Sequence, residues 1–358
     1  MTHKPRAREL GLPFPGTTGR NNAITDVQGV EVGFCTLTDR TKGVRTGVTA
    51  ILPRGKSNDA IPVWAGHYAL NGNGEMTGAH WIDDAGYFLG PILVSNTHAI
   101  GACHSAAVQW MIDTYANHFK GQAWAMPVVA ETYDGFLNNV TTLSVKPEHA
   151  RAALESAQSG PVEEGSTGGG NGMIAYEFKG GTGTSSRLVT LGQTYTVAAL
   201  VQANFGIRPW LTILGKPVGS LMPEDRIHED ETGSVIVIIA TDAPLSELSL
   251  RALAKRGAIG IARSGTIGGN SSGDIFMAFT TANPQPMSAR VELARTVTYL
   301  NAEHLNPIYQ AAVEAIDEAV INALVAGEDV PSVHPHGRIC RAINVEHLRK
   351  IFAADQRA

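Results

Sequence analysis

Apolar residues along this chain fall mostly into short runs, and Gly, Pro, Asn and Asp residues separate one run from the next. Runs of this length and spacing predict β-strands. In the first half of the chain they are GVEVGFCTL from Gly29, VTAILP from Val48, IPVWAG from Ile61, PILVSNT from Pro91 and MPVVAE from Met126. Farther along the chain they are MIAYEF from Met173, YTVAALVQAN from Tyr195, LTILG from Leu211, SVIVIIATD from Ser234 and DIFMAFTTAN from Asp274.

Helical periodicity interrupts these strands. The predicted helices cover His98 to Phe119, Pro147 to Ala157, Pro244 to Arg263 and Asn306 to Gly327. The last of them has both a start and a stop signal, because Asn306 and Pro307 supply an N-cap and a proline at the first helical position, and Gly327 ends the pattern.

Several predicted strands are apolar on both faces, notably VIVIIA from Val235 and PVVA from Pro127. A strand of this kind needs cover on both sides. Two sheets packed face to face, with helices outside each sheet, provide that cover. The sequence has neither a low-complexity linker nor a fixed-period repeat, so we expect residues 1–358 to form a single domain.

Composition excludes several classes of function. The 358 residues carry 28 Lys and Arg against 33 Asp and Glu, a net charge of −5, so nucleic-acid binding is not expected. The free thiols of Cys35, Cys103 and Cys340 form no C-x-x-C pair and suit a reducing compartment. The longest strongly apolar run, Val235 to Ala240, is too short to cross a bilayer. We therefore expect a soluble cytoplasmic protein that does not bind membranes.

Cofactor motifs are absent or out of context. Gly170, Gly172 and Ala175 match a relaxed dinucleotide fingerprint, but they lead into the predicted strand MIAYEF instead of opening a helix. The 12 histidines include no H-E-x-x-H, and no G-x-S-x-G is present. We therefore predict neither a metal ion nor an organic cofactor, and we interpret the glycines as a hairpin or a loop lining a pocket.

Polar residues gather at the ends of the predicted strands. ETYDG from Glu131 ends one strand, Asn204 ends another, Gly233 and Ser234 precede VIVIIA, and NSSGD from Asn270 leads into IFMAF. Taken singly, each is an ordinary turn. The acidic segment PEDRIHEDETG, which ends at Gly233, is expected to be exposed and mobile.

Together, the segments VVAETYDGFLNN, VQANFG, GSVIVIIATDAPL and NSSGDIFMAFTTAN resemble the family of self-processing aminopeptidases that includes the L-aminopeptidase/D-esterase and the β-peptidyl aminopeptidases. The resemblance runs from NAITDVQGVEVG at Asn21 to the helix over Val313 to Leu324. It implies an α/β fold of the N-terminal-nucleophile-hydrolase type. This is an αββα four-layer sandwich with two packed, mostly antiparallel sheets covered by helices. It also implies a homo-oligomer, commonly a tetramer of processed pairs.

In that family the precursor cuts itself before a serine, and the new N-terminal serine is the catalytic nucleophile. Carried over to this chain, the cut lies between Gly233 and Ser234 and leaves pieces 1–233 and 234–358. A serine hydroxyl is a weak nucleophile until a base takes its proton. The α-amine that cleavage releases, with a reference pKa of about 7.7–8.0, can act as that base near neutral pH.

The resemblance also implies roles for other residues. Asn204 would donate to the tetrahedral oxyanion, and Ser272 and Asp274 would orient the nucleophile and its amine. Tyr133 would lie near the tetrahedral centre. Glu131 would bind the ammonium group at the N-terminus of a small peptide, amide or ester substrate, because a partly buried carboxylate is the natural partner of that group.

Two other functions remain open at this stage. One is an acyltransferase like the self-cleaving ornithine acetyltransferases, which as a rule use a threonine nucleophile, whereas Ser234 favours hydrolysis. The other is an uncleaved binding or assembly protein of the same fold. Within the aminopeptidases, the sequence leaves the choice among L-, D- and β-aminoacyl substrates open, although Gly233 fits the L-aminopeptidase/D-esterase branch somewhat better.

Overall fold

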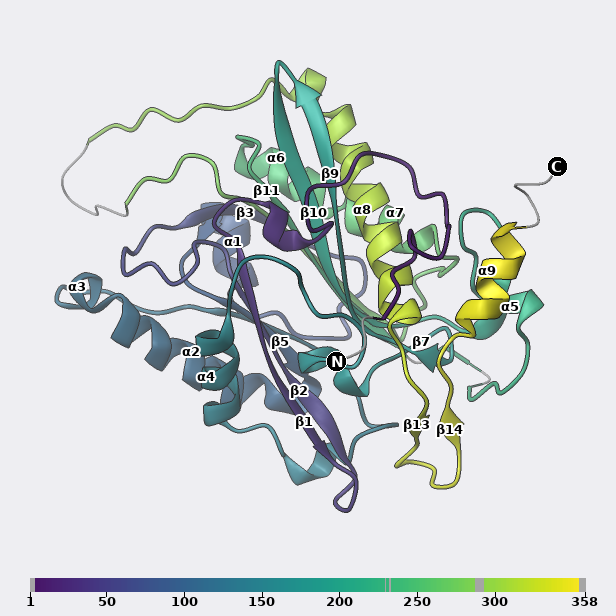
Figure 1. Ribbon diagram of the computed structural model, residues 1–358. Helices are drawn as coiled ribbons and strands as arrows, with labels where there is room; N and C mark the ends of the chain where they lie inside the picture. Colours follow the sequence, from purple (N-terminus) through teal and green to yellow (C-terminus); the bar gives the residue numbers. More distant parts are fainter. Residues whose placement is uncertain (1–3, 229, 232, 287–292, 354–358) are drawn as a thin grey trace.

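Two β-sheets pack face to face at the centre of the computed structural model, and helices cover the outer face of each sheet (Figure 1). The structure describes residues 4–228, 230–231, 233–286 and 293–353. The four layers confirm the αββα sandwich.

The smaller sheet has the order β1-β2-β5-β6. Its strands are β1 (Glu31–Asp39), β2 (Val44–Leu52), β5 (Ile92–Asn96) and β6 (Val128–Thr132). Neighbouring strands are antiparallel except for β5 and β6, which run parallel.

The larger sheet has the order β4-β3-β12-β11-β10-β9. Its strands are β3 (Val63–Ala69), β4 (Tyr87–Phe88), β9 (Gly181–Leu191), β10 (Gln193–Asn204), β11 (Ser234–Thr241) and β12 (Gly273–Thr280). Here β11 and β12 are the parallel pair, and the other neighbours are antiparallel.

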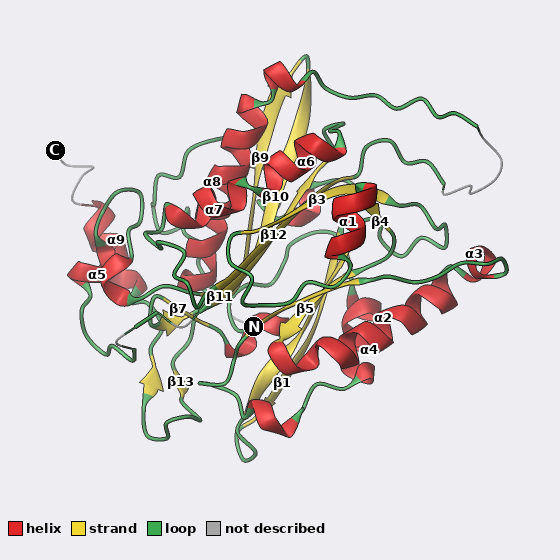
Figure 2. Cartoon of the chain, turned by 180° about the vertical axis from the view of Figure 1, so that it is seen from behind, coloured by secondary structure: helices red, strands yellow, loops and turns green. Residues whose placement is uncertain are grey.

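Three apolar clusters separate the four layers. The inner faces of both sheets meet in one cluster, to which β11 contributes Ile236, Ile238 and Ala240. The alternate β11 residues Val235 and Val237 face a second cluster, beneath α6 (Glu247–Ala254), α7 (Arg256–Ala262) and α8 (Asn306–Val325). The third cluster lies between the smaller sheet and helices α2 (Ile100–Thr114) and α4 (Pro147–Ser156) (Figure 2). The strand VIVIIA is therefore buried on both faces, as its sequence predicts.

The helices are shorter than the sequence patterns suggest. They are α1 (Ala79–Ala85), α2 (Ile100–Thr114), α3 (Ala116–Phe119), α4 (Pro147–Ser156), α5 (Val218–Leu221), α6 (Glu247–Ala254), α7 (Arg256–Ala262), α8 (Asn306–Val325) and α9 (Val345–Ala353). In the described ranges no helix combines the length and apolar character needed to cross a bilayer.

Three helix predictions need correction. The helix expected over His98 to Phe119 is broken at Tyr115, whose backbone leaves the helical region. The one expected from Pro244 starts only after Ser246, whose hydroxyl caps α6 by accepting from Ser249 N, and it is divided into α6 and α7. The N-cap of α8 is Leu305, so Asn306 is already helical.

Two strand predictions are wrong. LTILG forms no named strand and has only an isolated bridge between Ile213 and Lys216. MIAYEF is a tight hairpin of β7 (Ile174–Ala175) and β8 (Phe178–Lys179). Tyr176 and Glu177, with φ of +51° and +60°, turn the chain between its two strands. Two further short strands, β13 (Val330–Pro331) and β14 (Ile339–Cys340), pair with each other.

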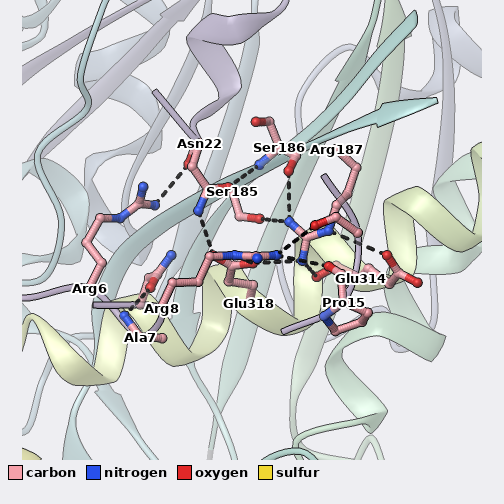
Figure 3. Close-up of polar contacts among 12 residues, drawn as sticks. Arg6, Ala7, Arg8, Pro15, Asn22, Ser185, Ser186, Arg187, Glu314 and Glu318 are labelled. Atoms are coloured by element: carbon pink, nitrogen blue, oxygen red, sulfur yellow. Dashed lines mark hydrogen bonds and ion pairs between the residues drawn. The ribbon is translucent and has the colours of Figure 1, made fainter. Parts of the chain in front are cut away.

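A buried charge cluster attaches the N-terminal segment to the helical layer (Figure 3). Glu318 on α8 accepts from Arg8 Nε at 2.9 Å, from Arg187 Nη2 at 2.7 Å and from Asn22 Nδ2 at 2.6 Å. The Arg187 side chain is only 1% exposed and also donates to Ser185 Oγ. One carboxylate thus joins the N-terminal segment, β9 and α8.

We predict that Glu318→Gln lowers the free energy of unfolding by about 3 kcal/mol, because Arg8 loses its ion pair with Glu318 and the fully buried Arg187 keeps only the longer 3.5 Å pair with Glu314. Urea titration followed by tryptophan fluorescence measures the change. Glu346→Gln, which removes an exposed ion pair with Arg349, is the matched control and should cost less than about 1 kcal/mol. Equal unfolding midpoints for the two variants would contradict the prediction.

Candidate active site

The candidate site forms where three strands of the larger sheet begin or end. Ser234, the first residue of β11, stands opposite Asn204, the last residue of β10. On its other side Ser234 pairs with Gly273, the first residue of β12. Because β10 is antiparallel to β11 and β12 is parallel to it, the turn after Asn204 and the turn before Gly273 lie on the two sides of Ser234.

The hydroxyl of Ser234 receives two hydrogen bonds. Tyr133 N donates to Ser234 Oγ at 3.2 Å, and Asn204 Nδ2 donates to it at 3.3 Å. The Asn204 amide is itself fixed, because its Oδ1 accepts from Ile174 N at 2.9 Å and its Nδ2 also donates to Tyr133 O at 2.9 Å. Ser234 is 4% exposed. Two rigid donors thus converge on a buried hydroxyl.

Tyr133 reaches the serine through its backbone. The side chain is 55% exposed and lies over Gly135, where an added Cβ would come within 2.2 Å of Tyr133 Oη. Gly135 therefore leaves room for the phenol.

A cavity of about 210 Å³ adjoins these groups. Its walls include Tyr133, Asn204, Phe136, His228 and His334. The cavity gives a small ligand access to the donors around Ser234.

Gly233 is held tightly against β10. A Cβ at Gly233 would lie 2.7 Å from Asn204 O and 2.8 Å from Phe205 Cα, so a larger residue would force the backbones apart. The carbonyl of Gly233 accepts from Gly273 N at 3.3 Å. The peptide bond before Ser234 therefore has a fixed position and a polarised carbonyl.

Ser272 and Asp274 form a pair beside the site. Ser272 Oγ donates to Asp274 Oδ1 at 2.7 Å, and both side chains are buried. Burial, with the nearby Glu231 charge, raises the pKa of Asp274 to about 6. Strand alternation places Asp274 on the helix-facing side of the sheet, while Ser234 faces the other sheet. Among the described contacts, the Ser234 hydroxyl has no hydrogen bond to either of them.

Glu131 lies on β6, at the edge of the same region. Its carboxylate accepts from Glu75 N at 3.0 Å and from Thr97 Oγ1, and it is 4% exposed. A Cβ on Gly74 would lie 3.2 Å from Glu131 Oε1 and 3.7 Å from Gly273 Cα, so the carboxylate and the start of β12 border one small space. Burial raises the pKa of Glu131, and the hydrogen bonds from Thr97 and Glu75 partly offset this.

Sequence reasoning missed three residues that shape the site. Ile174 orients Asn204 through its backbone N–H, which no side-chain pattern reveals. Asp134, 1% exposed, follows Tyr133 and accepts from Asn138 Nδ2, and burial raises its pKa to about 6. Glu231, in the acidic segment, binds neighbouring backbone groups.

The acidic segment was expected to be exposed and mobile, and this is wrong in part. Ile227 N and His228 N each donate to Glu177 at 2.7 Å, and Glu231 is also held. Residues 229 and 232 of this segment lie outside the described residues. Over the described ranges, no three His, Cys, Asp or Glu side chains are grouped so that they could hold a metal ion.

The chain is similar to known proteins in both sequence and fold. The profile of peptidase family S58 matches residues 22–338. The chain is 47% identical to a β-peptidyl aminopeptidase, BapA, of Sphingosinicella microcystinivorans, over 98% of this chain and 94% of the relative. It is 51% identical to the solved L-aminopeptidase D-Ala-esterase/amidase of Ochrobactrum anthropi, with a TM-score of 0.94 over 99% of both chains.

A second solved structure, a β-aminopeptidase of Burkholderia sp., is 43% identical, with a TM-score of 0.89 over 98% of this chain and 99% of that one. The Ochrobactrum anthropi protein is described as a prototype of the serine aminopeptidases and as a variant of the Ntn hydrolase fold. The fold of this chain is therefore the Ntn hydrolase fold.

We predict that Asp274→Asn stabilises the protein at pH 7.5. Because burial raises the pKa of this carboxyl from 3.8 to about 6, the folded state binds its proton more tightly than the unfolded state does. Stability is therefore lost as the pH rises from about 4 to above 6, on the order of 1–3 kcal/mol.

Thermal melting at pH 4 and pH 7.5 tests this, with Ser234→Ala present in every sample so that no amine at Ser234 can pair with Asp274. In this background Asp274→Asn should raise the melting temperature at pH 7.5 and leave it nearly unchanged at pH 4. The control is Asp84→Asn, at an exposed position of α1, which should leave the melting temperature close to that of the background. Equal melting temperatures with and without Asp274→Asn at pH 7.5 would rule the prediction out.

Proposed function

Because the chain belongs to peptidase family S58, we propose that it becomes active by cutting its own backbone between Gly233 and Ser234. The membership and the relatives make the chain a hydrolase with aminopeptidase function. The self-cleavage, the nucleophile and the roles of the surrounding residues are the proposal. The observation that carries it is the convergence of two rigid donors on the hydroxyl of a serine that follows a tightly held glycine.

In the first reaction, Ser234 Oγ attacks the Gly233 carbonyl carbon. The C–N bond of the peptide breaks, an ester forms to the serine oxygen, and the nitrogen takes up a proton as a free amine. Water then hydrolyses the ester and leaves pieces 1–233 and 234–358. The hydrogen bond from Gly273 N to the Gly233 carbonyl supports this step, because it withdraws electron density from the carbon under attack.

In the second reaction, the new amine of Ser234 takes the hydroxyl proton while the oxygen attacks the substrate carbonyl. Tyr133 N and Asn204 Nδ2 then donate hydrogen bonds to the oxyanion that develops on the substrate carbonyl oxygen. Fixed donors of this kind need no reorganisation during the reaction, and removal of one such donor elsewhere costs ~2.7–4 kcal/mol. The C–N bond of an amide substrate, or the C–O bond of an ester, then breaks, and the leaving amine or alcohol takes the proton from the Ser234 ammonium. Water finally hydrolyses the ester to Ser234, which releases the acid and regenerates the hydroxyl.

Ser272 and Asp274 are proposed to support the amine. They flank Gly273, the register partner of Ser234, and this place favours the role. An ionised Asp274 near the amine would stabilise its protonated form and make it a better proton acceptor. For Ser272 or Asp274 to contact Ser234, the first residues of β11 would have to rearrange after the cut makes Ser234 a chain terminus.

Glu131 is proposed to bind the substrate ammonium group. Among the described contacts the buried Glu131 carboxylate accepts only from Glu75 N and Thr97 Oγ1, and a substrate ammonium would give it an ion pair. Small peptides, amino-acid amides and esters are the proposed substrates, and the processed pairs are proposed to assemble as a tetramer. Hydrolysis of p-nitroanilides with L-, D- and β-aminoacyl groups would establish which acyl class is preferred.

The self-cleavage predicts that intact-mass analysis of the purified protein shows two chains, of 233 and 125 residues. Ser234→Ala should give one chain, because no hydroxyl is left to attack the Gly233 carbonyl. Ser105→Ala, at an exposed position of α2, is the control and should be cleaved like wild type. An intact wild-type chain that nevertheless hydrolyses peptides would falsify the N-terminal-nucleophile mechanism.

The ammonium role predicts that Glu131→Gln lowers kcat/KM for substrates with a free amine by an amount equivalent to ~2–5 kcal/mol. An N-acetylated substrate, already poor, should change little. Glu75→Gln is the matched control, because Glu75 is exposed and its backbone N–H, which binds Glu131, is kept. Wild-type rates for processed Glu131→Gln on free-amine substrates would show that the assignment is wrong.

A further inference from the structure

Glu231 lies three residues before Ser234, and its carboxylate occupies a site made of three donors. Gly206 N donates to Glu231 Oε1 at 2.9 Å, and Thr266 Oγ1 donates to the same oxygen at 3.2 Å. Gly269 N donates to Oε2 at 3.0 Å. We call these three donors the Glu231 cradle.

The cradle joins the two turns that border Ser234. Gly206 follows Asn204 by two residues, at the end of β10. Thr266 and Gly269 belong to the segment between α7 and β12, and Gly269 O accepts from Ser272 N at 2.9 Å. Since β11 lies between β10 and β12, the carboxylate links the strands on both sides of Ser234.

Gly269 is shaped to receive this carboxylate. A Cβ at Gly269 would lie 2.2 Å from Glu231 Oε2, so a larger residue there would displace the carboxylate from its present position. Both carboxylate oxygens are used, and each accepts from an N–H group. An amide in place of the carboxylate would offer one acceptor and set an NH2 group against one of those N–H groups.

From this geometry we infer that Glu231 is a positioning residue for self-cleavage, which holds the segment before Ser234 so that the Gly233 carbonyl stays within reach of Ser234 Oγ. This inference rests on the self-cleavage proposed above. Between the cradle and β11 the chain is fixed at two points, because Gly233 O also accepts from Gly273 N. Holding the two reacting groups in one geometry accelerates an intramolecular attack.

The role ends with the cut, since Glu231 then belongs to the piece that does not carry the nucleophile. The carboxylate has no hydrogen bond to Ser234, Asn204 or Tyr133 among the described contacts. Loss of the carboxylate should therefore slow processing and leave the processed enzyme active. A substitution that acts only through general stability would impair both.

The test measures the half-time of conversion to two fragments during cell-free translation, with timed samples on a denaturing gel. Glu231→Gln should lengthen the half-time at least about tenfold, the effect expected when hydrogen bonds to a charged group are lost. Once processing is complete, kcat/KM of Glu231→Gln should fall by a much smaller factor than the processing rate does, because the cut removes the link between Glu231 and the nucleophile. Glu224→Gln, an exposed change of the same kind in the same segment, is the control and should process at the wild-type rate.

Two substitutions at Thr266 test the cradle through one of its donors. They keep the inference testable if Glu231→Gln does not fold. Thr266→Val removes one donor at similar volume and should slow processing, whereas Thr266→Ser keeps the hydroxyl and should restore it. Equal half-times for these two variants would overturn the inference. So would wild-type processing by Glu231→Gln, or an equal loss of processing and mature activity.

These outcomes are separate from a failure of the self-cleavage itself. Wild type that stays in one piece, or Ser234→Ala that is still cut, would reject the proposed cleavage. Wild type that is cut while Glu231→Gln is cut equally fast would reject only the role of Glu231.

Discussion

The direct pairing of Asn204 with Ser234 across two neighbouring strands is the constraint on which the candidate site depends. Eight opposed residue pairs, from Val197 and Thr241 to Asn204 and Ser234, fix this register. Alternate residues of both strands face different apolar clusters, so a slip by one residue would move every side chain to the wrong face. Apolar packing along the whole length of β10 and β11 therefore sets the position of an amide and a hydroxyl at one end.

The same region concentrates buried carboxylates. Glu131, Asp134 and Asp274 are each 4% exposed or less, and burial raises the pKa of all three. Such groups destabilise the folded chain when they are ionised, and a nearby cation relieves that cost. These carboxylates would therefore favour a positively charged group nearby. The proposed substrate ammonium and the proposed amine of Ser234 are both groups of this kind.

Sequence patterns predicted where the strands lie better than they predicted which side chains and backbone groups come into contact. The strand over SVIVIIATD was located correctly, because its apolar run begins directly after Gly233 and Ser234. LTILG is also apolar, but it does not pair with a neighbouring strand. The family resemblance identified Asn204, whose side-chain amide donates to Ser234 Oγ. The second donor is the backbone N–H of Tyr133, which no side-chain pattern marks, because any residue with an N–H group would supply it. Glu231 was hidden in a segment whose acidity suggested solvent exposure, because its partners are backbone groups brought close only by folding.

The position of the proposed cut explains how the chain could be divided without losing its fold. After cleavage, β11 and β12 would belong to the second piece, yet β10 and β3 of the first piece flank them in the sheet. The buried bond from Arg187 to Glu318 also crosses between the pieces (Figure 3). Hydrogen bonds on both sides of the β11 and β12 pair, together with a shared apolar core, hold the second piece in place without a covalent link. The amine would therefore be released at a point that the surrounding strands already keep rigid.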